Sequence, residues 1–156
     1  MSDTTTFEFL IPEAALAAFC EDLALLTEAT GDCPANEERA PSARALLLQL
    51  STLAAGDYRE ACLTLGFPAD AGLRAFQADN PELRAGRPDR VAVGCFWLGC
   101  RLADDHYRVS FTSATRAIAS LMQFSESVRH SFRALSRHAR NGEVQVINEW
   151  HEASRL

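Results

Sequence analysis

Lysine is absent from this sequence, so all fifteen of its basic side chains are arginines. Arginine and alanine codons are rich in G and C, and the composition bias of a bacterial or phage genome explains this usage most simply. A requirement for guanidinium in place of ammonium is the alternative. Nucleic-acid binding is not favoured, because the formal net charge is −6 and lysines interleaved with aromatic residues are missing.

Long apolar runs and an export signal are also missing. The longest apolar stretch, residues 91–102, is shorter than the ~18 residues of a membrane helix and ends beside Arg101. The first six residues lack the positive charge and the apolar stretch of a signal peptide. With 156 residues, 47% of them hydrophobic, we expect one cytoplasmic domain with its own core and no membrane contact.

Motifs for metals, cofactors and nucleophilic catalysis are lacking as well. There is no C-x-x-C, no H-x-x-x-H, no glycine-rich phosphate loop and no G-x-S-x-G sequence. We therefore expect no cofactor and no metal. The cysteines are odd in number and have no paired spacing, so we expect reduced, mostly buried thiols. They are Cys20, Cys33, Cys62, Cys95 and Cys100.

Apolar residues recur at spacings of three and four along most of the chain, and this pattern predicts an all-α fold. We expect a single domain, residues 1–156, built as an irregular bundle of six or seven short helices. Residues 1–11 are expected to form an extended arm. The candidate helix starts are Pro12, Ser42, Asp57, Asp70, Pro88, Thr112 or Ser113, Ser125 and Glu143. For the segments that follow Pro88 and Glu143, a strand is the alternative.

The segment from Val91 to Leu102 is the most apolar part of the chain. Its apolar residues cover all faces of a helical projection, which predicts a central buried helix with Phe96 and Trp97 in the core. A fully buried strand is the alternative, because periodicity alone does not separate the two. Short strands are also conceivable at residues 6–11, 106–111 and 143–147.

Charge is divided unevenly between the two halves of the chain. Residues 12–82 form an acidic half and residues 83–156 a basic half, with balances of −10 for residues 1–82 and +4 for the rest. Complementary fields speed the association of proteins, so the acidic patch suggests a basic partner such as a toxin or effector. Its candidate partner-binding residues are Glu21, Asp22, Glu37 and Glu38.

A row of arginines lies on the helix expected after Ser125. These residues step by four, four and three, which places them on one helix face: Arg129, Arg133, Arg137 and Arg140. The row could be an ordinary solvated face, a brace against the acidic half, or a second contact surface for an acidic protein. A nucleic-acid-associated regulator using residues 129–140 is a further alternative.

The sequence as a whole favours a small protein–protein interaction module of bacterial or phage origin, such as an immunity protein, an inhibitor or a secretion adaptor. The alternative from another class is a small enzyme. Its acid–base site would lie near Asp104, Asp105 and His106, which follow the most apolar segment.

Overall fold

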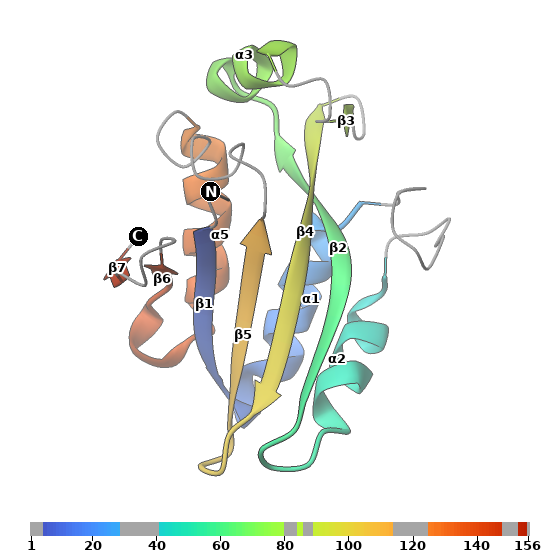
Figure 1. Ribbon diagram of the computed structural model, residues 1–156, viewed down its shortest axis with the longest axis vertical. Coiled ribbons are helices and arrows are strands. Elements are labelled where there is room, and N and C mark those ends of the chain that lie inside the picture. Colours follow the sequence, from blue (N-terminus) through green and yellow to red (C-terminus); the bar gives the residue numbers. More distant parts are fainter. Residues whose placement is uncertain are drawn as a thin grey trace.

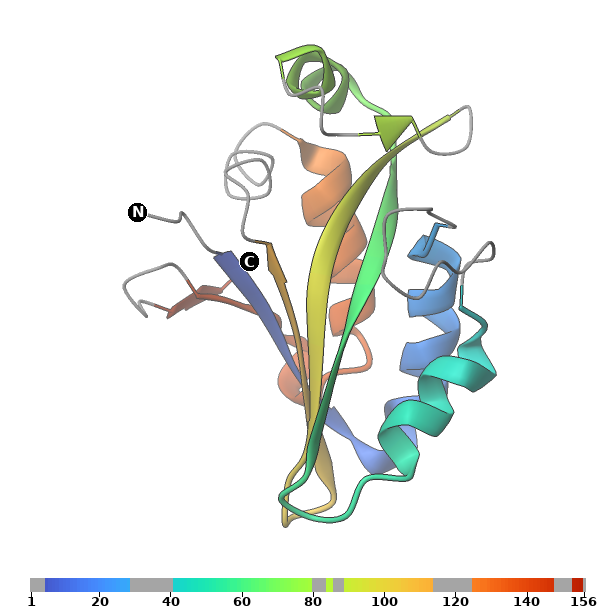
Figure 2. The same ribbon diagram turned by 45° about the vertical axis from the view of Figure 1, so that its right-hand side comes forward.

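The protein is an antiparallel sheet with helices packed on one of its faces. The computed structural model describes residues 5–28, 41–79, 84–85, 89–113, 125–147 and 153–155. Figures 1 and 2 show α1, α2 and α5 together behind the sheet, and α3 at its upper end. The elements are β1 (Thr5–Pro12), η1 (Glu13–Ala15), α1 (Leu16–Leu26), α2 (Ala43–Ser51), β2 (Tyr58–Pro68), α3 (Ala71–Asp79), β3 (Arg84–Ala85), β4 (Arg90–Arg101), β5 (His106–Ser113), α5 (Glu126–Ser136), η2 (Arg140–Gly142), β6 (Gln145–Ile147) and β7 (Ala153–Arg155).

The strands lie in the order β2-β4-β5-β1-β6-β7, and the two-residue β3 pairs with β4 beside this path. β2, β4 and β5 lie side by side in chain order as an antiparallel meander, with α3 and β3 in the connection between β2 and β4. β1 inserts between β5 and β6, with Phe7 opposite Phe111 on one side and Val146 on the other. The N-terminal residues expected as an arm over the core are therefore an interior strand of the sheet.

The core lies between the sheet and its helices. Alternate residues of each central strand point toward the helices, and those of β1, Phe7, Phe9 and Ile11, are almost fully buried. Phe132 of α5 stacks on Phe7, with ring centroids 4.1 Å apart. Other buried side chains come from all three helices on this face: Leu16, Phe19, Leu23, Leu46, Leu50, Val128 and Leu135.

The expected all-α bundle is wrong. The segment expected as a central buried helix is strand β4, the alternative that its apolar pattern had left open. The segment after Asp57 is strand β2, and the expected final helix contains β6 and β7. β2 pairs with β4 along its whole length, from Tyr58 to Pro68. Pairing between distant segments thus overrides the local helical spacing.

A side chain caps the first turn of α2, α3 and α5, whereas α1 follows η1 without a side-chain cap. Ser42 accepts a hydrogen bond from the backbone N–H of Ala45 (3.1 Å), and Ser125 accepts one from that of Val128 (3.3 Å), as expected for α2 and α5. α5 is shorter than expected because it ends at Ser136. Thr112 and Ser113 belong to β5, while the rest of the helix expected after them, residues 114–124, lies outside the described residues.

Asp70 caps two helices at once. Its Oδ1 accepts the backbone N–H of Leu73 in α3 (2.8 Å), which confirms the cap expected there. Its Oδ2 accepts the hydroxyl of Ser125 (2.9 Å) and the backbone N–H of Ser127 (3.1 Å) at the start of α5. One carboxylate therefore ties the N-terminal ends of two helices that are far apart in sequence.

Candidate functional site

β4 carries apolar residues on both of its faces. Its odd-numbered positions, such as Val93 and Trp97, point to the core and are buried. Its even-numbered positions point to the other side of the sheet, and none of them between Ala92 and Cys100 is polar or charged. In an antiparallel sheet with one face in water, the outward positions are normally polar. β4 is therefore apolar on a face that none of the three core helices covers (Figure 2).

Strand register defines this uncovered surface. Residues paired across an antiparallel ladder share a face, and neighbouring strands lie ~4.8 Å apart. One row therefore runs Glu60–Leu98–Ser110–Glu8–Gln145, and a parallel row runs Tyr58–Cys100–Arg108–Leu10. Cys62 and Phe96 are paired in the next row. We call the surface made by these residues the open face.

Two aromatic side chains of the open face are exposed. Tyr58 is 65% exposed and Phe96 is 55% exposed, whereas Trp97, the next residue along β4, is 2% exposed. The expectation that Trp97 lies in the core is confirmed, and the same expectation for Phe96 is wrong. Leu98 and Cys100, which lie beside them, are half-buried. The lower part of the open face is therefore an apolar surface with exposed aromatic rings at its centre and its edge.

The upper end of this side of the sheet is closed by the segment that follows α1. The carboxylate of Glu28 pairs with Arg90 of β4 at 3.0 Å, and both side chains are largely buried. The guanidinium of Arg90 also donates to the carbonyl of Leu25 (2.8 Å). Glu28 lies directly over Gly66, where an added Cβ would approach its Oε1 to 2.3 Å. The accessible part of the face thus begins below Gly66.

Negative charge surrounds the lower end of the open face. Glu60 is exposed on the face itself, and Asp57, Asp104 and Asp105 are exposed in the turns next to it. The cation beside these turns, Arg101, has its guanidinium near carboxylate oxygens of Glu13 (3.8 Å) and Asp105 (4.0 Å), so its charge is balanced locally. The exposed aromatic rings therefore lie in an acidic setting.

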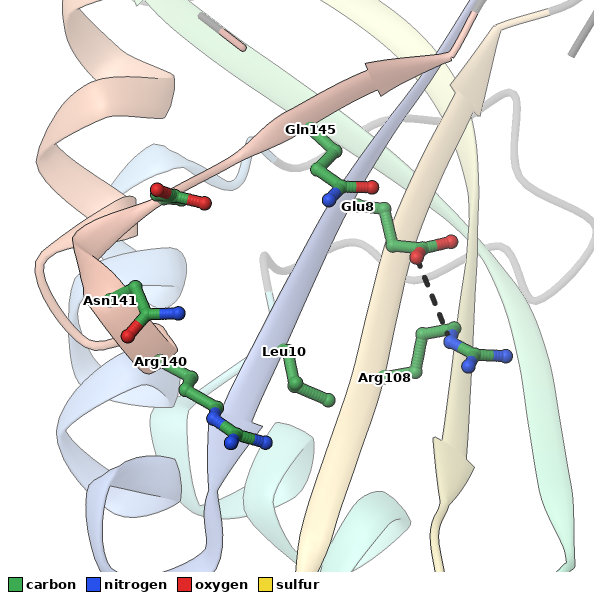
Figure 3. Close-up of a pocket in the computed structure, with 7 residues that line it drawn as sticks. Glu8, Leu10, Arg108, Arg140, Asn141 and Gln145 are labelled. Atoms are coloured by element: carbon green, nitrogen blue, oxygen red, sulfur yellow. Dashed lines mark ion pairs between the residues drawn. The ribbon is translucent and has the colours of Figure 1, made fainter. Parts of the chain in front are cut away.

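A polar hollow borders the other side of the open face, where β1 and β5 meet η2 and β6. It has a volume of about 260 Å³, and Figure 3 shows Leu10 between the guanidinium groups of Arg108 and Arg140. Arg108 lies 3.6 Å from the carboxylate of Glu8. Asn141 and Gly142, with φ of 62° and 63°, turn the chain from α5 toward β6. Opposite charges alternate here, so the hollow has no strong field of one sign.

The arginine row expected on one helix is divided among three places. Arg129 and Arg133 line a shallow hollow of about 420 Å³ between α5 and the β2–α3 connection, and Arg129 lies 3.5 Å from Glu126. Arg137 follows the end of α5 and pairs with Asp22 of α1. Arg140 lines the hollow described above. Arg129, Arg133 and Arg137 keep helical spacing, because Arg137 is the C-cap of α5, whereas Arg140 lies beyond the helix in η2.

Part of the acidic patch is engaged within the molecule. Oδ2 of Asp22 lies 2.5 Å from Nε2 of His138 and accepts a hydrogen bond from Nε of Arg137 (3.1 Å). Partial burial alone would raise the pKa of Asp22, but the hydrogen bonds and charges of His138 and Arg137 lower that pKa below its ordinary value. Glu21 is exposed, while Glu37 and Glu38 lie outside the described residues. Asp22 and Arg137 thus form an ion pair between the acidic and the basic half of the chain.

The acid–base cluster expected near the second hairpin is a tight turn. The backbone N–H of Leu102 donates to the carbonyl of His106 (2.8 Å), and Asp105 has φ of 59°. Nδ1 of His106 bonds the carbonyl of Asp104 (2.8 Å). These polar groups stabilise the connection between β4 and β5.

None of the four described cysteines is in a disulfide: Cys20, Cys62, Cys95 and Cys100. Burial raises the pKa of the Cys20 thiol to about 12. In the part of the chain that the structure describes, no cluster of three or more His, Cys, Asp or Glu residues could hold a metal ion. Within the same ranges, no helix combines the length and the apolar character that crossing a membrane requires.

Sequence reasoning missed Tyr58, Glu60, Phe96 and Leu98 as functional candidates. Phe96 was expected in the core of a central helix, and Tyr58 and Glu60 lie in the segment that was expected to form a helix from Asp57. The available signal was the apolar character of residues 91–102 on every side, because a strand with that pattern has two apolar faces to cover. Comparison of the chain with known protein families, with curated proteins and with solved structures gives no match.

Proposed function

We propose that this chain is a protein–protein interaction module that binds a basic protein through the open face of its sheet. The observation that carries the proposal is the exposure of Phe96 (55%) in a strand whose outward positions from Ala92 to Cys100 are all apolar. An immunity protein, an inhibitor or a secretion adaptor is the kind of role that such a module performs in a bacterial or phage-infected cell.

The energetic argument concerns the cost of leaving this face in water. Each Å² of apolar surface removed from water contributes about 25 cal/mol, and exposed aromatic side chains dominate the energy of protein interfaces. A contiguous apolar patch with a polar rim is typical of an interaction site. Tyr58 and Phe96 provide the aromatic anchors here, and Glu60 with the acidic turns provides the rim.

The charge of the molecule identifies the class of partner. The formal net charge is −6, and the residues next to the exposed rings are predominantly acidic. Such a field attracts basic proteins and repels acidic ones, and it acts mainly on the rate of association. A partner that offers large apolar side chains flanked by lysine or arginine therefore fits this face best.

Selection from a random peptide library tests the proposal without a known partner. Peptides selected on the wild-type protein should be apolar and positively charged. Their affinity should fall at least tenfold for Phe96→Ser, because the aromatic anchor is lost. Leu48→Ser is the matched control: Leu48 of α2 is 51% exposed, but it lies on the helical side of the molecule. Its substitution should leave the affinity unchanged.

Two results would contradict the proposal. Peptides whose binding depends on Leu48 and not on Phe96 would place the binding surface on the helices. Sedimentation velocity provides the second check: if the wild-type protein is a dimer and Phe96→Ser is a monomer, the face is covered by a second copy of this chain and not by a basic partner.

A further inference from the structure

The outer edge of β2 is open along its first half. β2 is the first strand in the sheet order, with β4 as its only neighbour on the path through the sheet. Near its far end, the backbone N–H of Glu28 donates to the carbonyl of Thr64 (2.9 Å), and Thr27 forms a bridge with Leu65. From Tyr58 to Cys62, no described residue pairs with the outer edge, and Tyr58 and Glu60 are exposed.

The direction of the backbone groups follows from these contacts. The carbonyl of Thr64 faces the outer edge, because it accepts the hydrogen bond from the backbone N–H of Glu28. The carbonyl of Asp57 faces β4, because it accepts the N–H of Arg101 (3.0 Å). Direction alternates along a strand, so the even-numbered residues Tyr58, Glu60 and Cys62 point their N–H and C=O groups outward. Their side chains lie on the open face.

A second copy of this chain fits this edge poorly. In an antiparallel ladder, outward-pointing residues must lie opposite one another. If two copies pair about a two-fold axis at Glu60, the two Glu60 side chains lie opposite each other. If the axis lies at Arg59, the two Arg59 side chains do. Like charges directly opposite each other destabilise a ladder. Pairings centred further along β2 require Thr64, whose carbonyl is occupied by Glu28.

We propose that the outer edge of β2 from Tyr58 to Cys62 accepts an extended segment of the basic partner as an added antiparallel strand. The segment has lysine or arginine opposite Glu60 and apolar residues opposite Tyr58 and Cys62. Exposed edges are common sites of strand addition, in which backbone hydrogen bonds give affinity and alternate side chains give specificity. The inference rests on the proposed function, because the added strand would extend the open face beyond β2 by the width of one strand.

The experiment uses synthetic peptides and the full-length protein. The probe is a peptide with blocked ends and the sequence Thr-Val-Thr-Lys-Thr-Val-Thr. In an extended strand, its two valines and its lysine share one face. Its binding is followed by NMR at peptide concentrations up to several millimolar. Amide protons of Tyr58, Glu60 and Cys62 should exchange rapidly in the free protein and be protected on binding. A peptide with glutamate in place of lysine should bind roughly fivefold more weakly.

Two variants of the experiment separate strand addition from other modes of binding. N-methylation of the peptide amides that face β2 should abolish binding, whereas N-methylation of the amides that face away should not. Glu60→Lys should reverse the preference, so that the glutamate peptide binds better. Glu21→Lys makes the same charge change at an exposed site on α1 and should leave the preference unchanged.

Each alternative result has a distinct meaning. If the lysine peptide does not bind, if binding is insensitive to N-methylation, or if the free amides are already protected, strand addition is wrong. The proposed function then still depends on the separate library test of Phe96. A strand-paired dimer of the wild-type protein would likewise overturn the occupant inferred here.

Discussion

Replacement of Asp70 by alanine should lower the free energy of unfolding by about 2–3 kcal/mol. Loss of an N-cap side chain costs about 0.5–2 kcal/mol, and Asp70 provides this contact to both α3 and α5. It also holds the hydroxyl of Ser125, which itself caps Val128. Asp70→Asn should lower the free energy of unfolding by less. The amide oxygen of Asn can still accept the N–H of one helix, but its NH₂ group cannot accept the N–H of the other.

The effect should depend on pH in a defined direction. Partial burial alone would raise the pKa of Asp70, but hydrogen bonds from the backbone of Leu73 and Ser127 and from the Ser125 hydroxyl lower that pKa below its ordinary value. A carboxyl with a lowered folded pKa contributes stability above its unfolded pKa of about 3.9 and loses it as the pH falls through the folded value. The difference between wild type and Asp70→Ala should therefore be complete at pH 7 and shrink below about pH 4.

Urea denaturation followed by circular dichroism at pH 7 and in acid measures both quantities. Asp79→Asn is the control, because Asp79 is an exposed carboxylate at the other end of α3, and its effect should stay within about 0.5 kcal/mol. A cost below 0.5 kcal/mol for Asp70→Ala at pH 7, or one that persists unchanged in acid, would refute the double-cap argument.

Three further outcomes follow from the packing. Trp97→Ala should cost roughly 3–5 kcal/mol in urea denaturation, whereas Phe96→Ala should cost under half as much; equal costs would contradict the assignment of the two faces of β4. Asp22→Asn should cost about 1 kcal/mol at pH 7 and nothing well below pH 4, because the pKa of Asp22 is lowered by its partners; a cost unchanged in acid would argue against those contacts. Iodoacetamide at pH 8 should modify Cys62 before Cys20, whose thiol pKa is about 12, as peptide mass mapping would show; early labelling of Cys20 would contradict its burial.

The helix starts were predictable because they depend on local chemistry. A serine or aspartate at Ser42, Asp70 or Ser125 meets the N–H of a residue three positions ahead, so the signal and its effect lie in the same short segment. The interior position of β1 was not predictable in this way. It depends on pairing with β5 about a hundred residues away, and alternation alone shows only that the segment is extended.

The apolar pattern of β4 indicates the candidate site only when the segment is known to be a strand. Residues 91–102 are apolar on all sides, and a helix in the middle of a bundle explains that pattern as well as a strand does. Pairing with β2 and β5 shows that only the odd-numbered half of these residues faces the core. The arginine row is also shorter than its spacing predicts, since α5 ends at Ser136 with Arg137 as its C-cap and Arg140 lies beyond the helix. Its role in binding stays a prediction.

The place of β1 in the sheet has a consequence for synthesis on the ribosome. Thr5 at the start of β1 pairs with Ser113 at the end of β5, so this first-made strand has no partner until residue 113 has been added. At about 5–20 residues per second, the wait lasts roughly 5–20 seconds. During that time Phe7, Phe9 and Ile11 have no neighbouring strand, while the β2-β4-β5 meander can already form from consecutive segments. The oldest strand therefore joins the sheet only after β5 has been made, and β6 can pair with it only later still.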